Sequence, residues 1–341
     1  MPLAPTIADI ARAAGVGTAT VDRVLNRRPG VNAETVQRVL QVVGELGTPQ
    51  QQPGRPRRGG NARFAYVLPA EHTPFLESVE RQIAQAAGDF RHAHITEVTH
   101  RIDASDPQRF AEELVLVGDC EGVALMAPDL PPVKGAINEL VRAGVHVVTL
   151  FSDVAGSMRE TFIGADNRAA GRTAGLLLGR MAREGRDTLL LSSQPTRMSA
   201  EIERRIGFAQ AIEERFPALR LLRTPDLPAD DEAARAALRQ VLKDDIDPAR
   251  VAGLYNVGSG STGAACALAD AGLAVGAVAH DFTDENAALL SSDALSYVLH
   301  QDVHYCILTA ARVLRALCEN VRGALNVVQP RIQILTAENL H

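Results

Sequence analysis

Residues 6–46 read TIADIARAAGVGTATVDRVLNRRPGVNAETVQRVLQVVGEL, and this stretch decides the fold of the amino-terminal part of the chain. Apolar residues recur at helical spacing from Ile7 to Ala14, which predicts a helix, and the hydroxyl of Thr6 can cap its free amides. Gly15-Val16-Gly17 follows at once and is too short for anything but a sharp turn. The stretch therefore begins with one helix and a tight corner.

A second and a third helix follow the glycine turn. The second is expected over residues 18–25, and it buries valine side chains such as Val21 on one face. Its opposite face exposes Thr18, Ala19 and Arg23. The third helix begins after its cap, Asn32, and its inner stripe consists of Val36, Val39, Leu40, Val43 and Leu46. A helix, a tight glycine turn and a second helix form the helix-turn-helix pattern, whose second helix lies in the major groove of DNA.

The charge is unevenly divided along the 341 residues. The whole chain has a net charge of −6, yet residues 1–60 hold eight arginines against four carboxylates and so carry +4, which leaves −10 for the remainder. A basic head on an acidic body predicts that only the head meets a polyanion. The length suits two or three domains, and 46% hydrophobic residues suffice for a large core.

The cysteines and the apolar runs indicate the compartment. Cys120, Cys266, Cys306 and Cys318 show neither a C-x-x-C spacing nor a disulfide framework, so we interpret them as buried small hydrophobic residues in a reducing compartment. The first residues lack a basic start followed by an apolar run, and no stretch approaches a membrane-spanning length. We expect a cytoplasmic protein, located on the nucleoid when bound to DNA, with no contact to a membrane and no metal site.

Residues 47–61 form a linker that reads GTPQQQPGRPRRGGN. Its prolines, glycines and lack of apolar periodicity exclude a folded element of any length, so it separates a headpiece of residues 1–46 from a body of residues 62–341. Arg55 and the arginines after it either lie extended in a narrow minor groove or belong to a solvated basic tether. The composition favours the tether.

The body alternates apolar strands with amphipathic helices, which predicts parallel sheets with helices on both faces. The pattern restarts midway, so an all-α headpiece should be followed by two doubly wound α/β lobes. Lobe one is expected at about 62–165 with 303–325, and lobe two at about 166–302 with 326–341. Ligands of such sheets bind outside the carboxyl ends of the strands, so two facing lobes form a ligand cleft.

Short segments throughout the chain match a known family. In the headpiece they are Thr6-Ile7-Ala8-Asp9-Ile10-Ala11, Ala14-Gly15-Val16, Thr20-Val21, Arg23-Val24-Leu25-Asn26 and Val31. In the body they are Thr73-Pro74-Phe75, residues 162–167 with Gly171, Arg204 three residues before Gly207, and Gln301-Asp302. The chain thus resembles the lactose-repressor (LacI/GalR) family, whose effector domain is similar to type I periplasmic sugar-binding proteins. The linker departs from the family, because it lacks the hinge helix whose apolar residue wedges into the minor groove.

The resemblance implies a sequence-specific DNA-binding transcriptional regulator, a repressor and not an enzyme, with double-stranded DNA as its partner. Thr18, Ala19 and Arg23 would touch base edges, and Arg23 can bridge the two acceptors of a guanine. The phosphate contacts would come from Thr6, Asn26, Asn32 and Thr35. One headpiece covers too little DNA to be specific, so a homodimer on a near-palindromic operator is expected. No leucine-heptad helix follows the last strand, so the dimer should be the final assembly.

The expected effector is a small sugar or polyol. Its hydroxyls donate and accept, so its site needs carboxylates, amides, a forked arginine and a flat ring. The family's ligand residues fall most clearly on Phe75, Arg204, Asp281 and Gln301, and less directly on Ser152, Asp153 and Asn256. A phosphate-bearing effector would need more cations than Arg204 alone, so we expect a neutral effector. No cofactor is expected.

One motif supports a different class of protein. Gly258-x-Gly260-x-x-Gly263 follows an expected strand and precedes an expected helix, and Asp281 lies 18 residues further on, as in a dinucleotide site. An NAD(P)-dependent oxidoreductase is therefore the alternative. It is disfavoured because this fingerprint belongs to the first strand and helix of its fold, whereas here it lies late in the second lobe. No Ser-His-acid or H-E-x-x-H arrangement supports a hydrolase, and we expect no catalytic residue.

Overall fold

The computed structural model describes residues 7–25, 30–46, 62–89, 95–194, 197–319, 321 and 327–340. The chain forms two compact units, residues 1–59 and 60–341. Thr6, Asn26, Arg55 and the whole linker lie outside the described residues, so the expectations for them stay predictions. The two units are taken separately below.

The first unit consists of three helices around one small core. They are α1 (Ile7–Ala14), α2 (Thr18–Leu25) and α3 (Ala33–Leu46). Gly15 has a φ of 65°, a left-handed conformation that glycine adopts without strain, and it turns the chain between α1 and α2. The side chain of Asn32 caps α3, because its Oδ1 accepts a hydrogen bond from Thr35 N at 2.8 Å.

The core of this unit is built from all three helices. Its fully buried side chains are Ile10, Ala11, Ala14, Val21, Val24 and Val39. Leu40 is 52% exposed, so the expectation that it belongs to the inner stripe of α3 is wrong. The reason is rotational: Val39 enters the core, and the next residue of a helix points about 100° away from it. Val42 and Val43 complete the apolar stripe instead.

Lobe one of the second unit is a parallel sheet covered by helices on both faces. Its strands pair in the order β2-β1-β3-β4-β5. They are β1 (Ala62–Pro69), β2 (Ile95–Ile102), β3 (Gly122–Leu125), β4 (His146–Leu150) and β5 (Thr161–Ile163). The helices of this lobe are α4 (Pro74–Asp89), α5 (Pro107–Leu116), α6 (Pro131–Arg142) and α12 (Val303–Cys318).

Lobe two has a six-stranded sheet in the order β11-β10-β9-β8-β6-β7. Its strands are β6 (Thr188–Ser192), β7 (Arg220–Arg223), β8 (Val251–Asn256), β9 (Gly276–His280), β10 (Tyr297–His300) and β11 (Gln333–Leu335). Its helices are α7 (Asn167–Met181), α8 (Ser199–Arg215), α9 (Asp231–Asp244), α10 (Ser261–Asp270) and α11 (Asp284–Ser291), with the 3-10 turn η2 (Pro248–Arg250) before β8.

The edge strand β11 departs from the purely parallel sheets that we expected. It pairs antiparallel with β10, with Leu299 opposite Ile334. The chain reaches β11 from α12 in the other lobe, and the described residues between them form no helix. Neighbouring parallel strands are joined by a crossover connection, usually a helix that packs on the same sheet. Because the chain between β10 and β11 passes through α12 of the other lobe, this connection does not impose the parallel direction on β11.

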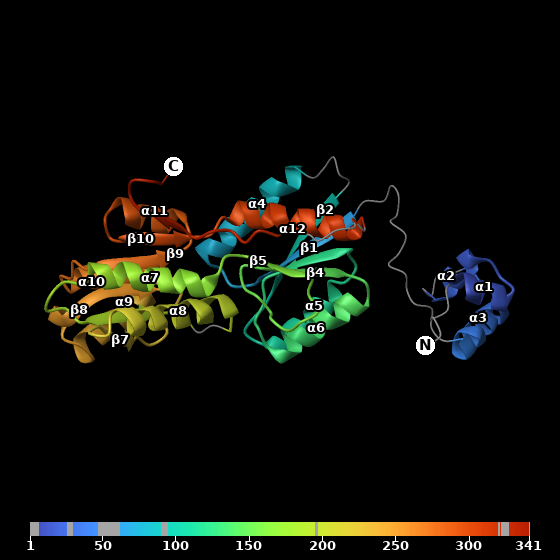
Figure 1. Ribbon diagram of the computed structural model, residues 1–341, viewed down its shortest axis with the longest axis horizontal. Helices are drawn as coiled ribbons and strands as arrows, with labels where there is room; N and C mark the ends of the chain where they lie inside the picture. The colour runs from blue at the N-terminus through green and yellow to red at the C-terminus, as the bar shows by residue number, and fades with distance from the viewer. Residues whose placement is uncertain are drawn as a thin grey trace. The chain divides into compact units, whose positions relative to one another are not determined.

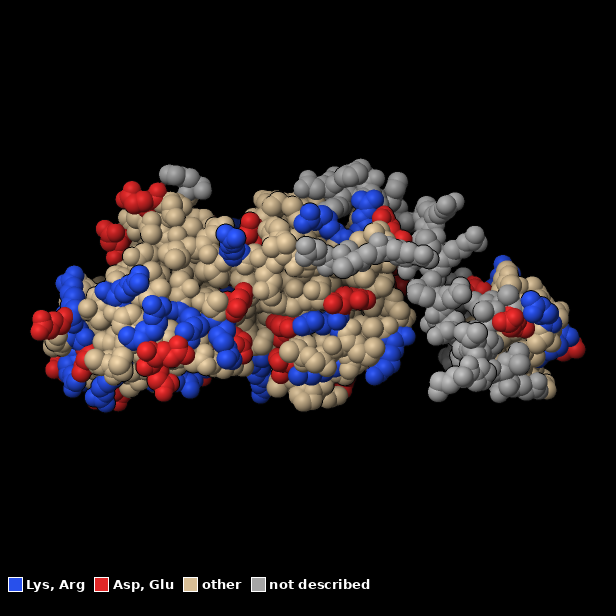
Figure 2. Space-filling model, in the orientation of Figure 1, with Lys and Arg blue, Asp and Glu red and all other residues tan. Residues whose placement is uncertain are grey.

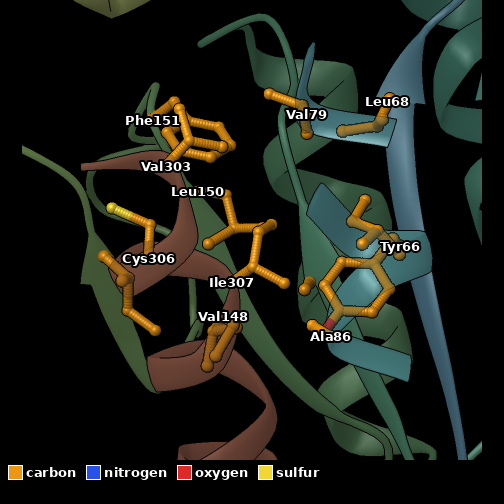
Figure 3. Packing of buried hydrophobic residues seen from close by; sticks show 14 of the residues in the cluster. Tyr66, Leu68, Val79, Ala86, Val148, Leu150, Phe151, Val303, Cys306 and Ile307 are labelled. Atoms are coloured by element: carbon orange, nitrogen blue, oxygen red, sulfur yellow. The ribbon is translucent and has the colours of Figure 1, made fainter. Parts of the chain in front are cut away.

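The helix α12 belongs to lobe one although it follows the strands of lobe two in sequence (Figure 1). Val303, Cys306 and Ile307 on α12 pack with Val148 and Leu150 of β4 in one buried cluster, which also takes in α4 (Figure 3). The opposite face of the same sheet is covered by α5 and α6. Because α12 starts immediately after β10, the chain crosses between the lobes at residues 301–302, as it also does between β5 and α7.

Among the cysteines, only Cys306 is fully buried. Cys120, Cys266 and Cys318 keep part of their surface exposed, so the expectation of four buried cysteines is wrong for these three. Cys120 precedes β3 and Cys318 ends α12, whereas Cys266 lies within α10 on a side that its neighbours cover only in part. All four thiols are free.

Candidate functional site

A cavity of about 850 Å³ lies between the two lobes of the second unit. Residues that follow the carboxyl ends of strands in both sheets line it, among them Met126 after β3, Phe151 after β4 and Asp281 after β9. In open α/β sheets, ligands bind at this end of the strands, where loops replace the hydrogen-bonded ladder. The volume falls in the range of small-molecule sites, which is about 300–1,000 Å³.

A buried polar cluster centred on Arg204 forms one wall of the cavity. The guanidinium donates from Nε to Asn167 Oδ1 at 2.9 Å, and its Nη1 lies 3.5 Å from Asp281 Oδ2 and 3.5 Å from the carbonyl oxygen of Val257. Gln301 Nε2 donates to the other oxygen of Asp281 at 3.5 Å. Arg204 and Asp281 are only 6% and 8% exposed, so their charges compensate each other inside the protein.

Two glycines place Arg204 by letting α7 and α8 approach each other closely. A Cβ on Gly171 of α7 would lie 1.9 Å from the carbonyl oxygen of Arg204, and a Cβ on Gly207 of α8 would lie 2.1 Å from that of Arg168. Only glycine fits at both contacts. The rims of the same helices are tied by Arg172–Glu214 and other ion pairs, and acidic and basic side chains alternate over this face (Figure 2).

An aromatic pair forms part of the opposite wall. Phe75, at the start of α4, and Phe151, after β4, meet edge to face with their ring centroids 5.4 Å apart. Both rings line the cavity, and they offer the flat apolar surface that a sugar ring lies against. Phe151 has a φ of 58° and Asp281 a φ of 65°, which are conformations that side chains other than glycine rarely adopt. The two lobes thus each hold one strained residue at the cavity.

The glycine-rich turn before α10 also faces the cavity. Gly258 and Gly260 line it, and Gly260 adopts a φ of 77° at the cap of the helix. Gly263 has another role, since a Cβ there would lie 2.1 Å from the carbonyl oxygen of Asp231 at the start of α9. The third glycine of the motif therefore serves contact between two helices, whereas in a dinucleotide site it serves contact between helix and strand.

Four of the seven residues expected in the effector site line the cavity: Phe75, Arg204, Asp281 and Gln301. The expectation is not met for Ser152, Asp153 and Asn256, whose side chains have partners inside the fold. Ser152 and Asp153 contact Ser199 at the start of α8, and Asp153 also forms a bidentate ion pair with Arg159. The positive φ of Phe151 turns the chain, so Phe151 takes the place at the cavity that we assigned to its neighbours.

Asn256 supports the glycine turn from behind. It is 2% exposed, and its Nδ2 donates to Ser261 Oγ at 2.9 Å and to the carbonyl oxygens of Gly258 and Ser259. Its Oδ1 accepts from Ser192 Oγ at 2.9 Å. All of its hydrogen-bonding capacity is thus used within the protein, and it fixes the conformation of the turn that faces the ligand.

Among the residues that line the cavity and were not expected from the sequence are Phe151, Glu201 and Asn286. Glu201 lies on α8 three residues before Arg204, so helical spacing from Arg204 was a signal that could have found it. Asn286 donates from Nδ2 to the carbonyl oxygens of His280 and Asp281 at 2.9 Å each and thereby holds the strained strand end. Phe151 gave no signal, because it reads as the last residue of an apolar strand.

The titratable groups at the bottom of the cavity have displaced pKa values. Burial, opposed only in part by Arg204 and Arg205, raises the pKa of Glu201 to about 7. Burial also lowers the pKa of His280 well below its ordinary value, and Arg204 adds to that effect, so the imidazole is neutral. Its Nε2 shares a hydrogen bond of 2.5 Å with the hydroxyl of Tyr255, whose own pKa is raised by burial.

In the first unit, the second helix presents a polar face. Thr18, Ala19 and Arg23 are exposed on α2, while Val21 and Val24 point into the core. Thr35 and Asn32 lie at the start of α3, where the amide of Thr35 donates to Asn32 Oδ1 at 2.8 Å. This is the arrangement in which a helix enters the major groove while neighbouring helix starts contact the backbone.

The described residues contain no group of His, Cys, Asp and Glu arranged to hold a metal ion. Within the same residues, no helix is both long and apolar enough to cross a membrane.

A helix-turn-helix unit followed in the chain by two facing sheet lobes with a polar cavity defines a class of helix-turn-helix proteins that carry a domain of the periplasmic-binding type. Residues 6–48 match the family model described as bacterial regulatory proteins, lacI family, and residues 64–321 match the periplasmic binding protein domain. The chain belongs to the LacI family of transcriptional regulators and carries a periplasmic binding protein domain as its body. These matches give no support to the oxidoreductase alternative.

Individual relatives agree with this family. The HTH-type transcriptional regulator in the aml 5′ region of Streptomyces limosus is 28% identical over 216 residues, which are 62% of this chain and 59% of that protein. The chain thus aligns with about three fifths of the length of this curated relative. MalR of Streptomyces coelicolor is 40% identical over 80 residues, 24% of this chain and 23% of that protein. A solute-binding protein from Burkholderia graminis, solved with D-arabinose, has a TM-score of 0.73 at 16% identity over 82% of this chain and 97% of its own, which shows the shared fold.

Proposed function

We propose that the protein is a transcriptional repressor that binds a near-palindromic operator as a homodimer and is controlled by a small sugar or polyol. The observation that carries the effector part is the cluster of Arg204, Asp281 and Gln301 opposite the rings of Phe75 and Phe151. It combines fixed acceptors, a forked donor and a flat apolar surface around a space of sugar size.

Control of DNA binding follows from where the cavity lies. The lobes touch where Ser199 of lobe two donates to the carbonyl oxygen of Asp153 in lobe one at 2.6 Å, and a ligand that contacts both lobes would stabilise one arrangement of them. It changes operator affinity only to the extent that it prefers one arrangement over the other, and typical coupling is about 1–3 kcal/mol. The contact between copies of lobe one would pass this preference to the headpieces.

For the DNA part, we propose that Thr18, Ala19 and Arg23 contact base edges. Thr6, Asn26, Asn32 and Thr35 would hold phosphates, and Arg55 would add a minor-groove or electrostatic contact. The support is the exposure of the polar face of α2 over a valine core, with the start of α3 beside it in sequence.

The test is a selection of genomic fragments by the full-length protein, with and without a panel of sugars and polyols that includes D-arabinose. We expect a preferred two-fold-related sequence whose retention changes with one member of the panel. Arg23→Ala should weaken the preferred site by about 1–3 kcal/mol and relax one base pair in each half-site. Arg38→Ala, which removes the same charge from α3, should lower binding to all sequences alike. Absence of any preferred fragment would refute the proposal.

A further inference from the structure

At the bottom of the cavity, the negative charges of the carboxylates are not fully compensated by the positive charges beside them. Arg204 already has Asn167, the carbonyl oxygen of Val257 and Asp281 as partners, and the carboxylate of Asp281 compensates its positive charge. Glu201 adds a second carboxylate to the same wall. When Glu201 is ionised, its negative charge is compensated only in part, because Arg204 is paired with Asp281, Glu71 and Asp281 oppose the effect of Arg205, and His280 is neutral.

Glu201 also has an unused acceptor. Its Oε2 is inaccessible to solvent and has no hydrogen-bond partner among the described residues, although part of the side chain remains exposed to the cavity. A buried carboxylate oxygen without a partner costs free energy that a donor group would recover. The position of Glu201 on α8, one turn before Arg204, directs it to the same space that the effector occupies.

The remaining arginines of the cavity do not supply this donor. Arg197 contacts the carbonyl oxygen of Ser105, Arg205 lies 3.4 Å from Ser193 Oγ, and Arg223 is exposed at the rim. The charged groups that act on Glu201 are Arg204 and Arg205 on its own helix, Glu71 after β1 and Asp281 after β9. Two of these four are carboxylates, which favour a further positive charge beside Glu201.

We propose that the effector is an amino sugar or amino polyol whose ammonium group binds Glu201 while its hydroxyls bind Arg204, Asp281 and Gln301. This inference rests on the proposed function and replaces the neutral effector that we expected from the sequence. One positive charge on the ligand compensates the ionised Glu201, and the ammonium binds its carboxylate from the cavity side, where part of the side chain is exposed. Binding then stabilises the ionised carboxylate, so the proton that Glu201 holds in part of the molecules near neutral pH is released.

The experiment is calorimetric titration of the full chain with matched pairs of sugars, D-glucosamine against D-glucose and D-galactosamine against D-galactose. At about pH 7 we expect one amino sugar to bind about tenfold to a hundredfold more tightly than its neutral partner. At about pH 5.5 this ratio should fall, because Glu201 is then protonated whereas the amine keeps its charge.

Two variants decide whether Glu201 is responsible. Glu201→Gln keeps the shape of the side chain and should abolish both the preference for the amine and its pH dependence. Glu213→Gln, an exposed carboxylate on the same helix, should leave the ratio unchanged. Thermal melting confirms that each variant is folded.

The outcomes separate the two proposals. Binding of a neutral sugar as tight as that of its amino partner overturns the amino-sugar inference and leaves the sugar-responsive regulator intact. An amine preference that survives in Glu201→Gln overturns the role of Glu201. If no sugar or amino sugar of the panel binds, both proposals fail.

Discussion

Gly171→Ala is expected to separate α7 from α8 and to displace the arginine that organises the cavity. The added Cβ would lie 1.9 Å from the carbonyl oxygen of Arg204, and real Cβ contacts stay above 3.0 Å, so the helices must move apart by about 1 Å. The partner atom is backbone and cannot rotate away. Overfilling of this kind costs about 1–3 kcal/mol, whereas alanine in place of glycine in a helix gains about 1 kcal/mol. Because the contact is rigid, we expect a net loss of about 2 kcal/mol.

The assay is thermal unfolding of the variant beside Gly135→Ala. Gly135 is an exposed helical glycine of α6 with no atom within 4 Å of the added Cβ, so its variant should be about 0.5–1 kcal/mol more stable than wild type. A loss of 2 kcal/mol lowers the melting temperature by about 4–8 °C in domains of 150–250 residues, and somewhat less in a larger one. Affinity for the effector should fall as well, since Arg204 moves with its backbone. If Gly171→Ala melts as high as Gly135→Ala, the close approach of the two helices is not a constraint and the reasoning fails.

Two further predictions concern charges of the cavity. Arg204→Ala should lower the free energy of unfolding of the body by about 3–5 kcal/mol in urea, because it leaves Asp281 buried without its countercharge. Arg239→Ala removes an exposed arginine and should cost less than about 1 kcal/mol. Equal effects of the two variants would contradict the role of the buried pair. Glu201 binds a proton more strongly in the folded than in the unfolded chain, so stability should fall as the pH rises from its ordinary pKa of 4.5 to about 7. Glu201→Gln should therefore be more stable than wild type at about pH 8 by up to roughly 3 kcal/mol, and no more stable below about pH 4.5, as measured by melting across that range.

The order of the elements could be predicted from local patterns. The glycine turn at Gly15, the cap at Asn32 and the exposed face of α2 depend on residues within one or two helical turns of each other, and the structure agrees with each of them. The alternation of apolar strands and amphipathic helices likewise predicted two lobes, because the apolar residues on one face of a helix or strand recur in the sequence with the period of that element.

Some residues of the cavity could also be predicted from the sequence. Arg204 and Asp281 were expected in the site because the ligand residues of the resembled family fall on them and because their side chains suit a hydroxylated ligand. Phe75 and Gln301 were recognisable through the family resemblance. These residues all line the cavity.

Only the tertiary structure decided which neighbours of these residues face the ligand. A single positive φ at Phe151 turns Ser152 and Asp153 toward α8, and the packing of α3 with Val39 in the core leaves the neighbouring Leu40 exposed. The charge balance around Glu201 is set by Glu71, Arg204 and Asp281, which come from separate parts of the chain. Sequence patterns report which face of its own element a side chain occupies. The burial and electrostatics of that side chain depend on segments that meet it only after folding, and these quantities determine what the cavity binds.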